Sequence, residues 1–72
     1  MKLVVKPYRG QLAWFAEFSN YPAFLIGRVK KLPTVADAMR IVNAWKLLVI
    51  DGRPYHYDKN HQAWVAYGTS IV

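Results

Sequence analysis

The chain has no cysteine among its 72 residues, which excludes disulfide bonds and thiolate metal sites. Small domains without disulfides suit a reducing interior, so we expect the protein in the cytoplasm. Acidic residues are also scarce, and four of them against ten lysines and arginines leave a net charge of +6. A basic excess of this size favours contact with nucleic acid or with an acidic surface of a host protein.

Long hydrophobic runs are missing as well. The longest uninterrupted apolar stretches, such as 21–26 and 47–50, are far shorter than the roughly 20 residues of a membrane-spanning helix, so we expect no membrane partner. The apolar content of 54% and the aromatic content of 15% nevertheless exclude intrinsic disorder. This apolar content exceeds what the core of one small domain hides, which allows a homodimer or another covered surface. We predict one domain over residues 1–72.

The residues that enzymes need are not arranged for catalysis. The four glycines are isolated, so no phosphate-binding loop is present, and the four carboxylates are scattered along the chain. His56, Asp58 and His61 form the one cluster of potential metal ligands, but their spacing matches no strong zinc signature. We interpret this cluster as a solvated turn, with a metal-dependent hydrolase as the weakest alternative. The sequence therefore predicts no enzyme, no cofactor and no metal.

A near-repeat is the most informative feature that the chain does contain. Lys6-Pro7-Tyr8 near the start resembles Arg53-Pro54-Tyr55 near the end, and each is followed by a segment with Gln, Ala and Trp. This pattern predicts two hairpins of similar design that flank a central strand and helix. The repeat also suggests that the first and last strands lie together.

Alternating and turn-forming residues predict the strands. We expect strands over 3–8, 11–18, 23–32, 53–57 and 62–67, with turns at Arg9-Gly10 and Asp51-Gly52, where positive φ is tolerated. Pro7 lacks an N–H donor and predicts that the first strand is an edge strand. Gly27 suggests a bulge or a close approach of two backbone segments.

Thr34, with Asp37 three residues later, has the pattern of a helix N-cap. An apolar stripe at helical spacing follows, and we expect it to face the core together with all three tryptophans. Residues 47–50 form either the helix end or a further strand, and the turn at Asp51-Gly52 favours a strand over 48–50. The fold class expected is thus α+β, with one antiparallel sheet of five or six strands, βββαββ or βββαβββ, packed on one helix. The apolar stripe of the predicted helix consists of Val35, Ala38, Met39, Val42 and Trp45, and Ile41 and Leu48 widen it.

Two family resemblances rest on residues 11–45. Trp14-Phe15-Ala16-Glu17-Phe18, then Tyr21-Pro22 and the segment 32–38, are similar to HicB-type antitoxins, in which a three-stranded sheet precedes a helix. That resemblance implies neutralisation of a small RNA-cleaving toxin. The chain departs from the family because it lacks the acidic loop and has Ala23 where glycine is expected.

The same stretch resembles AP2-like and integrase arm-type DNA-binding domains, through Trp14, Gly27, Thr34 and Ala38. In those domains a three-stranded sheet packed on a helix enters the major groove. Those domains have hairpins richer in Lys and Arg and lack a second hairpin like that at 51–67. Both resemblances imply a small module of the kind found in phages and mobile elements.

Basic side chains interleaved with aromatic ones carry the functional hypothesis. Cations bind phosphates and flat rings stack on unpaired bases, so we predict a small, non-catalytic nucleic-acid-binding module. The alternative is a phage-type protein that binds a host protein, such as a polymerase or defence enzyme, and inhibits or redirects it through an apolar patch or an edge strand. The predicted nucleic-acid-binding residues are Lys6, Tyr8, Arg9, Arg28, Lys30, Lys31, Arg53 and Tyr55.

Overall fold

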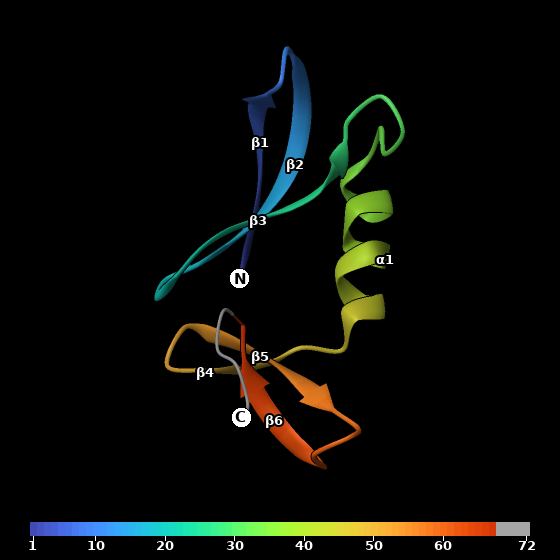
Figure 1. The fold of residues 1–72 in the computed structure, drawn as a ribbon. Coiled ribbons are helices and arrows are strands. Elements are labelled where there is room, and N and C mark those ends of the chain that lie inside the picture. The colour runs from blue at the N-terminus through green and yellow to red at the C-terminus, as the bar shows by residue number, and fades with distance from the viewer. Residues whose placement is uncertain (68–72) are drawn as a thin grey trace.

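The computed structural model describes residues 1–67, which form six strands and one helix. The strands make two antiparallel three-stranded sheets, and Figure 1 shows one above the other with the helix running beside them. The α+β class and the order βββαβββ are confirmed, whereas a single sheet of five or six strands is not. The elements are β1 (Lys2–Tyr8), β2 (Gln11–Phe18), β3 (Tyr21–Arg28), α1 (Val35–Trp45), β4 (Leu48–Ile50), β5 (Arg53–Asp58) and β6 (Ala63–Ala66).

Tight turns with positive φ build the hairpins that the sequence predicts. Arg9 and Gly10 have φ of 50° and 78°, and Asp51 and Gly52 have φ of 52° and 73°. Two such residues match the twist of the flanking strands, so each pair folds the chain directly back on itself. The first sheet has the order β1-β2-β3, which confirms Pro7 on an edge strand.

Strand β3 is shorter than predicted and is bulged near Gly27. Trp14 pairs with Gly27 and Phe15 pairs with Leu25, so Ile26 has no partner in the register. The strand ends at Arg28 rather than at residue 32 because the chain turns there. The amides of residues 31 and 32 both donate to the Arg28 carbonyl, each at 3.0 Å, and this closes the turn before the helix.

The helix begins at the predicted cap and buries a narrower face than predicted. The Thr34 hydroxyl accepts a hydrogen bond from the Asp37 amide at 3.2 Å, and the Asp37 carboxylate accepts one from the Thr34 amide at 3.3 Å. Ala38 and Val42 are buried, and Trp45 is half-buried. The helix ends where Lys46 adopts a left-handed φ of 52°. Three members of the predicted stripe, Val35, Met39 and Ile41, are exposed, and Leu48 belongs to β4.

An aromatic cluster joins the two sheets. The Phe24 ring lies 4.8 Å from Tyr67 and 5.9 Å from Trp45, measured between centroids. Tyr67 in turn lies 4.6 Å from the His56 ring of the second sheet. Around this cluster Ala16, Phe18 and Val42 form the buried core.

A contact between two turns also connects the sheets. The Asn20 amide in the β2–β3 turn donates to the Gly52 carbonyl in the β4–β5 turn at 3.0 Å, and the Asn20 side chain donates to the Asp51 carbonyl. The first and last strands belong to different sheets, so the pairing suggested by the near-repeat is wrong. The two prolines of the repeat also differ in place, since Pro7 lies on an edge strand and Pro54 on a middle strand.

Candidate nucleic-acid interface

The first sheet has one covered face and one open face. The covered face packs on α1 through Leu3, Ala16 and Phe24. Side chains alternate along strands, so the partners in the register identify the opposite face. Ala13 on β2 pairs with Lys6 on β1 and with Arg28 on β3. Phe15 on β2 pairs with Leu25 on β3. The open face of β1–β3 therefore carries aromatic, aliphatic and basic side chains without a helix over them.

A basic groove opens at the end of this face. It has a volume of about 420 Å³. Arg9 reaches it from the β1–β2 turn, Arg28 from the end of β3 and Lys31 from the loop before α1. Three segments distant in sequence thus bring three cations to one hollow. The groove is lined by Tyr8, Arg9, Leu25, Gly27, Arg28 and Lys31.

Aromatic rings extend the basic groove along the sheet. The Tyr8 and Phe15 rings meet edge to face, with centroids 5.9 Å apart. The Arg9 guanidinium lies 5.4 Å from the Tyr8 centroid, and the Lys6 ammonium lies 5.8 Å from the Phe15 centroid. At these distances the cations are attracted by the ring faces. The arrangement offers positive charge for phosphate and ring surface for a base within one face.

Lys6 is partly neutralised by its neighbour on β2. Its ammonium lies 2.8 Å from the Glu17 carboxylate. The hydrogen bond from Lys6 holds the pKa of Glu17 below its ordinary value, with nearby positive charge acting in the same direction and desolvation opposing it. No acidic side chain of residues 1–67 forms such an ion pair with Arg9, Arg28 or Lys31. The charge of the basic groove is therefore carried by these three residues.

A side chain on the covered face holds the loop that carries Lys31. The Trp14 indole N–H donates to the Leu32 carbonyl at 2.6 Å. The Val29 amide donates to the Leu12 carbonyl at 3.0 Å, which ties the start of the same loop to β2. Trp14 therefore does not line the basic groove, but it positions Leu32, the residue next to Lys31.

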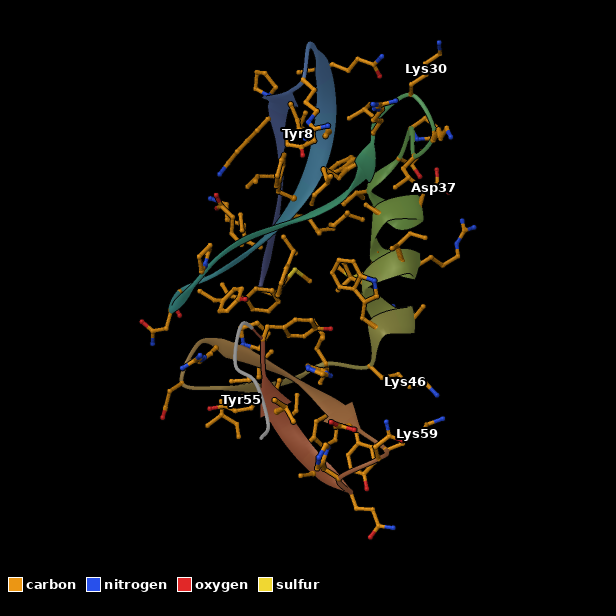
Figure 2. The ribbon with its side chains drawn as sticks, viewed as in Figure 1. Tyr8, Lys30, Asp37, Lys46, Tyr55 and Lys59 are labelled. Atoms are coloured by element: carbon orange, nitrogen blue, oxygen red, sulfur yellow. The ribbon has the colours of Figure 1, made fainter. Side chains whose placement is uncertain are left out.

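The structure divides the eight predicted binding residues. Tyr8, Arg9, Arg28 and Lys31 line the basic groove, and Lys6 lies on the same face. Lys30 does not line it, and in Figure 2 its side chain projects outward from the tip of the loop. Arg53 and Tyr55 lie on β5 in the second sheet. Sequence reasoning missed Phe15, Leu25 and Gly27. The signal that could have found Phe15 is the alternation along β2, which puts it on the face opposite Trp14.

The histidine-containing segment is used for packing and turn formation. Asp58 accepts hydrogen bonds from the amides of Asn60 and His61, and its carboxylate lies 2.9 Å from the His61 ring. The hydrogen bond with His61 is the main reason that the pKa of Asp58 is lowered. His56 instead contacts Tyr67. Within residues 1–67, no three His, Asp or Glu side chains gather as metal ligands would.

Among residues 1–67, no helix has the length and apolar character needed to cross a membrane. The chain matches no family model, no curated protein and no solved structure. The resemblances to HicB-type antitoxins and to AP2-like domains therefore stay predictions from sequence motifs.

Proposed function

We propose that the chain is a non-catalytic module that binds nucleic acid through the basic groove and the open face of β1–β3. The observation that carries this proposal is the convergence of Arg9, Arg28 and Lys31 on one hollow beside the Tyr8 ring. Cations from a turn, a strand end and a loop surround the hollow, which suits successive phosphates of a backbone. The net charge of +6 adds long-range attraction for a polyanion.

Direct binding measurements test this proposal. Fluorescence anisotropy of a labelled mixed-sequence oligonucleotide, as single strand and as duplex, would be followed between about 50 and 200 mM salt. Affinity should fall steeply with salt, because bound cations release the counterions of the phosphates. A preference for the single strand would point to stacking on Tyr8 and Phe15. No binding of either form at the low salt concentration would overturn the proposal.

Charge-neutral variants locate the contact. Arg28→Gln and Lys31→Gln should each weaken binding and reduce the salt slope by about 1. Lys59→Gln is the matched control, since it removes the same charge from the β5–β6 turn at the opposite end of the molecule from Tyr8 (Figure 2). Equal losses for Lys59→Gln and Arg28→Gln would mean that net charge, and not the basic groove, accounts for binding.

The alternative proposal, docking on a host protein with an acidic surface, predicts an apolar patch rimmed by basic residues. An apolar patch exists on the side of the second sheet that carries Tyr57 and Trp64, and Arg53 is the one charged residue at the strand positions of that side. The cations of the basic groove lie on the other sheet. This separation favours nucleic acid as the ligand of the basic groove.

A further inference from the structure

The second sheet carries a large apolar surface that no element of residues 1–67 covers. Residues that pair across neighbouring strands lie on the same side of a sheet, so alternate residues of β4, β5 and β6 share one side. The opposite side contains the buried residues Pro54 and Val65. Tyr57 and Trp64 meet edge to face at 5.4 Å, and each is 47% exposed. We call this surface the outer face of the second sheet. Its large side chains are Leu48, Ile50, Tyr55, Tyr57 and Trp64.

We propose that a second copy of this chain packs on the outer face of the second sheet, giving a twofold dimer. A sheet with two apolar faces needs a layer on each of them. The inner face is covered around Pro54, His56 and Val65, where Tyr67 packs between His56 and Phe24 of the first sheet, and is open only at its edge, at Val49. Within the described residues 1–67 the outer face has none, and an identical face related by a twofold axis would supply one.

The surface area of the chain agrees with a missing layer. A folded monomer of this mass is expected to expose about 4,600 Å², whereas this chain exposes 5256 Å². Its Cα radius of gyration is 13.3 Å, against about 11 Å for a compact domain of this length. The excess of roughly 650 Å² approaches the ~800 Å² that each partner covers in a standard interface. The exposed side chains of the outer face contribute to this excess, and a second copy packed on that face would cover them; they are Leu48, Ile50, Tyr57 and Trp64.

The distribution of charge permits this partner. Two copies of a chain with net charge +6 repel one another unless their basic groups stay apart. The basic groove belongs to the first sheet, and Arg53 is the one charged residue among the strand positions of the outer face. Contact through this face keeps the two grooves apart, and it is independent of what the grooves bind.

Sedimentation equilibrium of the wild-type chain tests the proposal. The mass should rise from 8.3 kDa to twice that value as concentration increases from about 1 µM to 1 mM, the range for a small interface. In amide NMR spectra over the same range, shift changes should concentrate in residues 48–66. A mass of one chain at every concentration would overturn the proposal. The same mass is expected if the outer face binds a different protein instead of a second copy.

Two variants compare the outer face with an equally apolar site elsewhere. Tyr57→Glu puts a charge on the outer face and should weaken association by about tenfold or more, since central tyrosines dominate such contacts. Leu12→Glu makes the same kind of change at a 55% exposed residue of the first sheet and should leave association unchanged. Thermal unfolding verifies that both variants are folded. Should Tyr57→Glu misfold, the wild-type NMR map decides, and shifts confined to residues 1–28 would overturn the proposal.

Discussion

Gly52 and Ser19 lie in turns that belong to different sheets, and a Cβ added at Gly52 would meet the Ser19 side chain. A Cβ built on Gly52 would overlap the Ser19 hydroxyl oxygen and would lie 3.1 Å from the Ser19 Cβ. The same glycine has a φ of 73° and accepts the hydrogen bond from the Asn20 amide. The β2–β3 and β4–β5 turns are thus in direct contact, and the positive φ is the main reason that position 52 favours glycine.

We expect Gly52→Ala to destabilise the fold by more than a turn substitution alone. The left-handed backbone costs an alanine about 1–2 kcal/mol. In addition, the Ser19 hydroxyl must rotate away and its Cβ, 3.1 Å from the built carbon, must shift slightly. Gly10→Ala is the matched control, because Gly10 has a φ of 78° but nothing lies within 4 Å of its added Cβ. Urea unfolding of both variants gives the comparison. Equal losses of stability would mean that the two turns do not touch in solution.

A second substitution separates the overlap from the backbone effect. Ser19→Gly removes both side-chain atoms nearest the built Cβ, and in combination with Gly52→Ala it should recover part of the lost stability. The coupling energy from this double-mutant cycle reports the contact directly. Additive effects would contradict the turn-to-turn packing.

Trp14→Phe should weaken nucleic-acid binding although Trp14 is not in the basic groove. The substitution removes the indole N–H that donates to the Leu32 carbonyl, next to Lys31. Loss of such a bond costs on the order of 1 kcal/mol and frees the loop. We expect a few-fold loss of affinity, smaller than for Lys31→Gln, in the anisotropy assay. Unchanged affinity together with lower thermal stability would restrict Trp14 to a structural role.

Glu17→Gln should strengthen binding. The change releases Lys6 from its 2.8 Å ion pair and removes a negative charge from the open face. A further cation then becomes accessible to phosphate, so affinity should rise several-fold and the salt slope should steepen by up to about 1. Asp51→Asn, in the turn of the other sheet, removes an equal charge and should have a smaller effect. A larger gain with Asp51→Asn would exclude Lys6 as a local contact.

Stability should decline at alkaline pH through Tyr67. Desolvation, and to a lesser degree the neighbouring Tyr21, raise the pKa of Tyr67 above its ordinary value of 10.0. The folded chain then holds this proton to higher pH than the unfolded chain. The stability that the neutral Tyr67 side chain contributes is fully present below pH 10, and it is lost as the pH rises through the folded-state pKa of Tyr67.

A comparison with Tyr67→Phe isolates the contribution of the Tyr67 hydroxyl to the loss of stability at alkaline pH. The difference in urea midpoint between wild type and Tyr67→Phe should shift between about pH 8 and about pH 11, with wild type losing more. Tyr57→Phe, which removes the hydroxyl of an exposed tyrosine, serves as the comparison. A constant difference across this range would contradict a desolvated Tyr67 between the sheets.

Local rules were sufficient for the elements of the fold. Positive φ is cheap at glycine and tolerated at aspartate, so Asp51-Gly52 could be recognised as a hairpin turn from the sequence alone. Thr34 and Asp37 satisfy free helix amides within four residues, and this also needs no distant partner. Side chains alternate along any strand, so the sequence of β2 by itself puts Phe15 on the face opposite Trp14.

Only the tertiary structure decided how these elements combine, because strand pairing depends on where the chain emerges in space. The 11-residue helix carries the chain about 16 Å along the first sheet, and Figure 1 shows it leaving at the far end. Strand β4 therefore starts a second sheet there. As a result Arg53 and Tyr55 lie away from the basic groove, and Trp64, expected in the core, is exposed. The sequence by itself determined the turns, the capped helix and the positive charge, whereas the non-local packing determined which cations share one groove.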